Sequence, residues 1–247
     1  MQISRWYKIL GITLLLTSIA FYSLEYIIFQ DPYHLFNFMV AKLAFLPIEV
    51  LIVTMVIHQI LYDMEKRQRL EKLNMVIGTF FSEVGTRLLT YFSDWDPNLD
   101  DIKSNLVITK EWTDSDFMKV KNQLKNYEYE VDINRVDLKH LRNMLIEHRD
   151  FLVRLLENPN LLEHETFTEL LRAVFHMTEE LISRTEDLDN LPESDLDHLR
   201  IDIERVYGKL VVEWLDYMEY MKDNYPYLFS LAMRKNPFDE SASPVVK

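Results

Sequence analysis

Glycine is scarce in this 247-residue chain and cysteine is absent, with four glycines and no cysteine in total. Phosphate-binding loops need two or three closely spaced glycines, so a Rossmann fingerprint, a P-loop and a Gly-x-Ser-x-Gly nucleophile elbow are excluded. The absence of cysteine excludes disulfides, thiol catalysis and cysteine-ligated zinc or iron–sulfur sites. With so few residues that favour loops, the chain is expected to be almost entirely helical.

Charge is nearly missing from the N-terminal quarter of the chain. The whole sequence carries 27 basic and 40 acidic residues, for a net charge of −13. Only three residues of each sign fall within residues 1–62, so the acidic excess belongs to residues 63–247. A change of composition this sharp predicts a boundary between an apolar segment and an acidic, polar one.

The apolar segment predicts a transmembrane hairpin. Residues 9–29 and 43–62 form two apolar runs, and about 20 helical residues are enough to cross a ~30 Å hydrocarbon core. Aromatic residues lie at the ends of the runs, as in interfacial belts: Trp6, Tyr7, Tyr26, Tyr33 and Tyr62. The alternative for the first run is a signal peptide cleaved after Ala20, but the apolar stretch continues well beyond that point. The lipid bilayer is therefore an expected partner.

Basic residues predict the orientation of this hairpin. Arg5 and Lys8 precede the first run, and a basic cluster over residues 66–72 follows the second, whereas the connecting loop offers only Lys42. The positive-inside rule then places both termini in the cytoplasm, in the cell or inner membrane. The basic cluster is mixed with acidic residues and the rest of the chain is acidic, so no nucleic-acid binding is expected.

Helical periodicity continues beyond the second run. One face is traced by Leu70, Leu73, Ile77, Phe81, Val84, Leu88 and Tyr91. A single helix is therefore predicted over residues 36–92, and its part over residues 63–92 would form a helical stalk.

Two glycines lie inside the predicted stalk. Gly78 and Gly85 are separated by two helical turns, with Ser82 between them. An interior glycine costs about 1 kcal/mol relative to alanine, so close approach of another helix would explain the pair. The alternative is that both glycines are tolerated without a role. On the first explanation, the three residues are helix contacts in a homo-oligomer that forms through the stalk and the spans.

Residues 93–238 predict an acidic, all-α cytoplasmic bundle. A loop over residues 93–116 contains a short extended piece at residues 106–108, and residues 239–247 are expected to form a disordered tail. Thr113 or Asp114 is expected to cap the first bundle helix, and Asn160 with Glu163 a later one. The predicted helices cover residues 114–127, 133–157, 160–187, 193–223 and 227–234.

Three ionisable residues lie within the predicted spans: Glu25, Glu49 and His58. The two glutamates have similar depths, so they could take up a proton or a cation in a small oligomeric channel or an ion-coupled protein. The alternative is structural. Lys42 lies two helical turns from Glu49 and could pair with it, and His58 could form a hydrogen bond at the interface.

Carboxylate–histidine pairs at helical spacing raise the question of a metal site. The pairs are Asp137 with His140, His176 with Glu180, and Asp195 with His198. The ferritin-like pattern of Glu-x-x-His with further inward glutamates is missing, and these faces are charged and expected to be solvated. His148 lies on an apolar stripe, where a hydrogen-bonded core histidine is expected. No metal, no cofactor and no catalytic constellation is predicted.

The C-terminal part is rich in aromatic residues, which could form a docking surface for a cytoplasmic partner or belong to an ordinary core. These residues are Trp214, Tyr217, Tyr220, Tyr225, Tyr227 and Phe229. The sequence as a whole favours a membrane-anchored, oligomeric interaction, scaffold or sensor module rather than an enzyme. The alternative is an ion channel or ion-coupled protein that uses Glu25 and Glu49.

Overall fold

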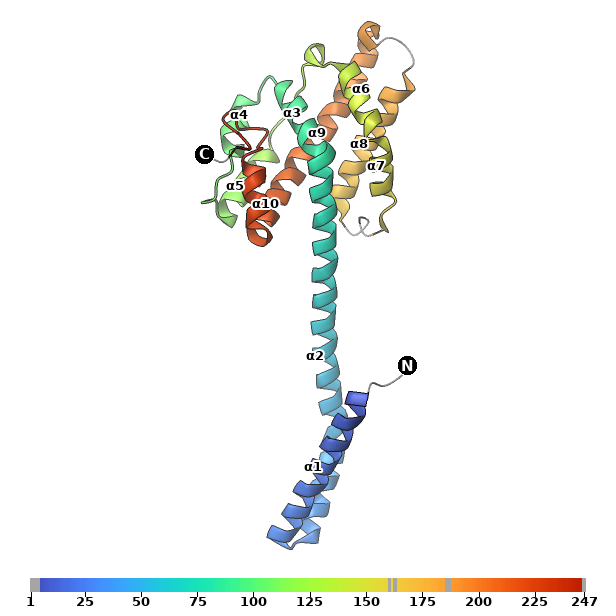
Figure 1. The fold of residues 1–247 in the computed structure, drawn as a ribbon, viewed down its shortest axis with the longest axis vertical. Helices are drawn as coiled ribbons and strands as arrows, with labels where there is room; N and C mark the ends of the chain where they lie inside the picture. The colour runs from blue at the N-terminus through green and yellow to red at the C-terminus, as the bar shows by residue number, and fades with distance from the viewer. Residues whose placement is uncertain (1–4, 160, 162–163, 185–187, 246–247) are drawn as a thin grey trace. The chain divides into compact units, whose positions relative to one another are not determined.

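A computed structural model describes residues 5–159, 161, 164–184 and 188–245 of the chain. Within these residues every regular element is a helix and there is no strand, so the all-α prediction is confirmed (Figure 1). The chain divides into two compact units, residues 1–66 and 67–247. Each unit is described by itself.

The first unit contains α1 (Arg5–Phe29) and the beginning of α2 (Pro32–Phe80). Helix α2 begins before the expected residue 36 because Asp31 caps it, accepting hydrogen bonds from the backbone N–H groups of Tyr33 and His34 at 3.0 and 3.1 Å. Pro32 stands at the first helical position, where its fixed φ and missing N–H are tolerated.

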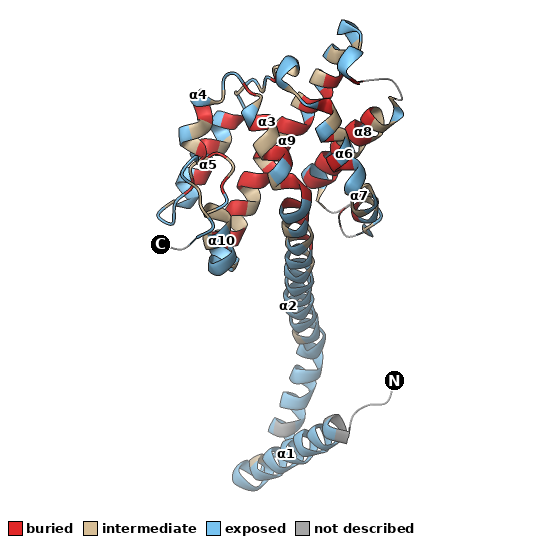
Figure 2. Ribbon diagram, turned by 45° about the horizontal axis from the view of Figure 1, so that its top comes forward, coloured by how far each residue is buried: buried red, intermediate tan, exposed pale blue. Residues whose placement is uncertain are grey.

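The helices of the first unit leave their apolar side chains uncovered. Both helices contain an apolar stretch long enough to cross a membrane, and none of either stretch is buried by protein (Figure 2). The hydroxyls of Thr13, Thr17 and Ser23 donate to backbone carbonyls one turn earlier, at 2.8–2.9 Å. These polar groups are therefore satisfied within their own helix. Helix α2 continues past Pro47 without a break.

The second unit begins with the end of α2, which leads through a π-helical turn, η1 (Phe81–Gly85), into α3 (Thr86–Asp94). The predicted helix to residue 92 therefore exists, but it contains a π turn and ends two residues later. In the expected loop the structure has α4 (Asp100–Lys103) and η2 (Ser104–Leu106). Residues 106–108 do not form a strand.

Helix α5 (Asp114–Leu124) begins with a capping box. The side chain of Thr113 accepts a hydrogen bond from the backbone N–H of Asp116, and the carboxylate of Asp116 accepts one from the backbone N–H of Thr113. This satisfies two N–H groups that the first turn leaves free. The cap predicted at Thr113 is therefore present.

The helix predicted over residues 133–157 is three pieces: η3 (Ile133–Arg135), α6 (Leu138–Glu147) and α7 (Arg149–Leu156). Asp137 starts a new helix because its carboxylate accepts from the backbone N–H of His140 at 2.8 Å. The chain breaks again at His148, whose ring Nδ1 lies 2.8 Å from the carbonyl oxygen of Met144. The hydrogen bond expected for His148 is therefore present, but the residue is partly buried rather than part of the core.

Four more elements complete the second unit: α8 (Glu165–Ser183), η5 (Leu188–Asn190), α9 (Glu193–Asn224) and α10 (Pro226–Met233). The cap predicted at Asn160 and Glu163 lies outside the described residues. Helix α9 runs through the core and contacts α3, α5, α8 and α10 (Figures 1 and 2). It alone carries twelve buried residues, so it organises the packing of the whole unit.

The segment after α10 differs from the disordered tail expected over residues 239–247. Phe238 is buried and its ring lies 5.2 Å from that of Trp214. Within the described part of the tail, Glu240 forms an ion pair with Lys103, and Pro244 accepts a hydrogen bond from Arg234. The last two residues lie outside the described part of the chain.

Candidate functional site

An aromatic pocket of about 750 Å³ opens in the second unit. Its walls come from the end of α2 with η1 and the start of α3, from the C-terminal half of α9, and from α10. This volume falls in the range of about 300–1,000 Å³ that is typical of small-molecule sites. The lining is mostly aromatic and aliphatic, with a few polar and charged side chains among it.

The pocket brings together two groups of residues that the sequence singled out separately. Seven of those residues line it: Gly78, Ser82, Trp214, Tyr217, Tyr220, Tyr225 and Tyr227. Gly85 and Phe229 do not line it, and Phe229 is instead buried in the core. The stalk glycine and the aromatic stretch therefore line one site.

Gly78 lets α9 approach α2 closely. A Cβ atom at this position would lie 2.6 Å from the hydroxyl oxygen of Tyr217, which is closer than non-bonded atoms tolerate. The Tyr217 ring stacks on Phe81, with centroids 5.4 Å apart and an interplanar angle of 10°. Burial raises the pKa of Tyr217 above its usual value, so the phenol stays neutral at physiological pH.

The π turn forms part of the same wall. Thr86 closes it, because its backbone N–H and its hydroxyl both donate to the carbonyl oxygen of Phe81, the hydroxyl at 2.8 Å. Gly85 makes room inside the turn, since a Cβ there would lie 2.6 Å from the Phe81 ring and 2.9 Å from the Phe80 ring. Single π turns inside α-helices occur frequently at functional sites.

Tyr225 ties the beginning of α10 to α2. Its hydroxyl donates to the carboxylate of Glu71 at 3.1 Å, and this hydrogen bond is the main cause that raises the pKa of Tyr225 to about 12. Its ring lies 6.0 Å from that of Tyr220 and 6.4 Å from that of Tyr227. The three tyrosines therefore form a connected aromatic rim.

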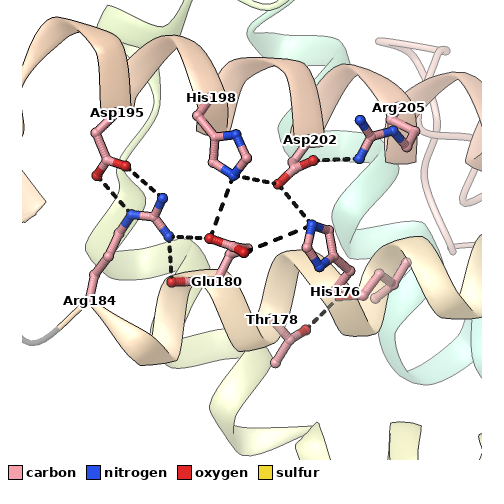
Figure 3. Close-up of polar contacts among 9 residues, drawn as sticks. His176, Thr178, Glu180, Arg184, Asp195, His198, Asp202 and Arg205 are labelled. Atoms are coloured by element: carbon pink, nitrogen blue, oxygen red, sulfur yellow. Dashed lines mark hydrogen bonds and ion pairs between the residues drawn. The ribbon is translucent and has the colours of Figure 1, made fainter.

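A second polar cluster lies between α8 and α9, at the histidines considered for metal binding (Figure 3). The buried carboxylate of Asp202 lies 3.4 Å from Nε2 of His176 and 3.5 Å from Nε2 of His198. Glu180 faces the same two histidines at 3.9 and 3.6 Å. The sequence predicted a solvated face here, which is wrong for Asp202, whose side chain is only 2 % exposed.

Two arginines compensate the carboxylates of this cluster. Arg184 binds both oxygens of Asp195 at 2.7 and 2.8 Å and also the carboxylate of Glu180 at 2.8 Å. Arg205 donates to Asp202 at 2.5 Å. Arg184 holds the pKa values of Glu180 and Asp195 below their usual range. In the described parts of the chain, no three histidine and carboxylate side chains are arranged to hold a metal ion. We interpret the cluster as a structural ion-pair network that holds α8 and α9 together.

The two glutamates of the first unit have partners of their own. The carboxylate of Glu49 lies 3.3 Å from the ammonium of Lys42, and that of Glu25 lies 4.0 Å from Nδ1 of His34. His58 is exposed on α2. The two glutamates are thus each placed beside a basic group rather than beside each other.

Several residues of these two sites are not distinguished by any pattern in the sequence analysis. Arg87 and Lys235 line the pocket and Arg184 ties two helices, but single basic residues in a charged chain are not distinctive. For Arg184, the four-residue spacing from Glu180, about one helical turn, is the sequence pattern that indicates an ion pair.

This fold and this pocket define an all-α protein with an N-terminal pair of apolar helices and a C-terminal helical domain. The family described as the C-terminal helical domain of the uncharacterized protein MJ1433 matches residues 69–234, and the corresponding N-terminal helical domain matches residues 2–61. The chain therefore belongs to the MJ1433 family. It is 48 % identical over 242 residues to "Uncharacterized protein MJ1433" of Methanocaldococcus jannaschii, which covers 98 % of this chain and 97 % of the relative. No solved structure matches the chain.

Proposed function

We propose that this chain is an integral membrane protein whose cytoplasmic helical domain acts as a sensor or interaction module, with the aromatic pocket as its binding site. Helix α1 and the apolar part of α2 anchor it in the bilayer, with both termini in the cytoplasm. The chain forms a homo-oligomer through its uncovered spans, since the stalk glycines Gly78 and Gly85 pack against side chains of the same chain. The cytoplasmic domain presents the pocket to a ligand or protein partner. It has no catalytic role.

The observation that carries the proposal is the uncovered apolar surface of the first unit. A core helix of a soluble protein can be equally long and apolar, but it is mostly buried by the rest of the protein. These two apolar stretches are 0 % buried. Large continuous apolar surfaces are rare on soluble monomers and mark contact with a membrane or with another protein. The basic residues on the side of both termini favour a cytoplasmic second unit.

An ion pathway through Glu25 and Glu49 has less support. An intramembrane carboxylate is a functional candidate by default, but Glu49 lies beside Lys42, which neutralises its charge. A structural role in the hairpin explains that pair without a conducted ion.

Single-cysteine labelling tests the anchor and its orientation, because the chain has no native cysteine to give background. Tyr33→Cys places a thiol on an 81 % exposed position between the spans, and Met118→Cys places one on a 60 % exposed position of α5. We expect a membrane-impermeant maleimide to label Tyr33→Cys in intact cells and Met118→Cys only after permeabilisation.

Both variants should stay in the membrane fraction after extraction with alkaline carbonate. Release into the soluble fraction would overturn the anchor. Equal labelling of the two thiols in intact cells would overturn the orientation.

A further inference from the structure

We propose that the aromatic pocket binds an anionic amphiphile, a molecule with a single hydrocarbon chain and a carboxylate or phosphate head. This inference rests on the proposed role of the pocket as a binding site and names its ligand class. It follows from the apolar lining of the pocket, from the charges at its edge and from its size.

The lining offers an apolar surface that folding leaves partly uncovered. Large apolar side chains that remain exposed gather at the pocket, with Met75 at 58 %, Tyr227 at 72 % and Leu228 at 41 % exposure. Met218 and Met221 lie deeper in the same wall. Aromatic rings with flexible thioethers adapt to a hydrocarbon chain, because methionine fills irregular spaces and changes rotamer easily. Burying a chain here would remove both surfaces from water.

The charges of the lining select the head group. Arg87 and Lys235 both line the pocket and are exposed, and neither side chain has an ion pair among the residues that the structure describes. Some basic side chains of this acidic chain pair with carboxylates, as Lys121 does with Asp216 and Glu219 at 2.5 Å. Others have no described ion pair, but Arg87 and Lys235 are the two basic residues that line the pocket. Unpaired cations at one pocket are therefore positions where an anion gains attraction.

Glu83 also lines the pocket without an ion pair in the described structure, so the lining carries a net charge of one positive unit. The hydroxyl of Ser82 has no described partner and could donate to the head. A ligand with an anionic head matches this positive balance. The pocket volume of about 750 Å³ suits one chain rather than a large partner, which is why we favour an amphiphile over a protein segment.

The test uses the full chain in nanodiscs of phosphatidylcholine, with Trp214 in the pocket wall as the fluorescent reporter. The probes are dodecyl phosphate and dodecanoate, compared with dodecyltrimethylammonium and with inorganic phosphate alone. We expect saturable changes in tryptophan emission with the anionic amphiphiles, at least tenfold weaker binding of the cationic one, and none of inorganic phosphate. The signal should be lost in Trp214→Phe and in empty discs.

Two matched double variants make the test specific. Arg87→Gln with Lys235→Gln should weaken the anionic probes at least tenfold. Lys110→Gln with Arg172→Gln removes the same charge from exposed positions outside the pocket and should leave binding unchanged. Ser82→Trp, which fills the pocket from an exposed position, should abolish binding of every probe.

Each outcome decides the inference. Equal binding of anionic and cationic amphiphiles, or no effect of the pocket double variant, overturns the assignment of an anionic head. Binding of inorganic phosphate alone overturns the amphiphile. Absence of any amphiphile binding, in protein that is stably inserted in the discs, overturns the ligand class while the membrane anchor stands. Preference of dodecanoate over dodecyl phosphate, or the reverse, tells which head group the pocket takes, because the two probes have chains of the same length.

Discussion

At the scale of single residues, Gly78 is a position where the pocket wall leaves no room for a Cβ atom. The Cβ atom of an alanine would meet the hydroxyl of Tyr217 at 2.6 Å, but the next nearest atom of that ring only at 3.2 Å. Overpacking costs about 1–3 kcal/mol, and replacement of a helical glycine by alanine returns about 1 kcal/mol. We expect Gly78→Ala to lower the free energy of unfolding by up to about 2 kcal/mol, measured by denaturant unfolding. Adding Tyr217→Phe should restore most of that loss.

Gly11 supplies the control for this prediction. No atom lies within 4 Å of a Cβ built there, so Gly11→Ala should not destabilise the protein. If Tyr217→Phe failed to rescue Gly78→Ala, the clash with the hydroxyl would not be the cause of the loss.

The close contact at Gly78 could be predicted from the sequence, but the residue that makes it could not. A glycine inside a helical pattern has a cost, and that cost pointed to a close contact at Gly78. Its partner Tyr217 could not be predicted, because helical periodicity places a side chain on a face but does not say which other helix covers that face. Asp202 was misjudged for the same reason, since the face of α8 with His176 and Glu180 buries it.

At the scale of elements, Arg184 joins the end of α8 to the beginning of α9. Its side chain is 13 % exposed and binds Asp195 and Glu180. Hydrogen bonds between charged groups contribute about 1.5–3 kcal/mol, so we expect Arg184→Gln to lower the free energy of unfolding at pH 7 by about that amount. Arg200→Gln is the matched control, since Arg200 on α9 is 34 % exposed and its partners lie on its own helix. It should cost below about 1 kcal/mol.

The same variant should change the pH dependence of stability. Arg184 lowers the pKa values of Glu180 and Asp195, from ordinary values of 4.5 and 3.8. A carboxyl with a lowered pKa in the folded state stabilises the protein above its unfolded pKa and loses that contribution as the pH falls through its folded pKa. Stability of the unsubstituted protein should therefore fall below about pH 4.5 more steeply than that of Arg184→Gln. Parallel curves of unfolding free energy from pH 7 to pH 2 would contradict this.

The positions of helices were largely predictable, but their interruptions were not. Apolar periodicity indicated the helices that became α5, α8, α9 and α10. It ran without a visible break through residues 133–157, where Asp137 starts a new helix and His148 ends it. A side chain that bonds a nearby backbone N–H can end one helix and start another instead of letting the first continue. Apolar periodicity does not show which of these two outcomes occurs.

At the scale of the whole molecule, the change of composition near residue 62 is the clearest feature of the sequence. The structure divides into two compact units whose boundary in the chain, between residues 66 and 67, lies close to it. The charge balance of the first unit leads to a prediction about Glu25 and Glu49. If these residues only complete the hairpin, glutamine at both positions should preserve membrane insertion and oligomeric state. Liposomes with the unsubstituted protein should show no ion flux above that of empty liposomes.

Lys42→Gln is the informative companion variant, because it leaves Glu49 without its basic neighbour. It should reduce insertion or assembly more than Glu49→Gln does. The carboxylate left unpaired by Lys42→Gln lies inside the predicted span, whereas the ammonium left unpaired by Glu49→Gln lies at its edge and can reach the interface. A proton or cation flux that the glutamine variants abolish would instead favour the channel alternative.

The π turn at Phe81–Gly85 amounts to one residue more than a regular α-helix needs over the same rise. Each residue of an α-helix advances the chain by about 100° around the axis, so this extra residue sets the angular phase between the end of α2 and α3. Deleting one residue inside it would leave a helix of good local geometry whose two halves face the wrong neighbours. The pocket wall is therefore sensitive to the number of residues between Gly78 and Arg87 as well as to their identity.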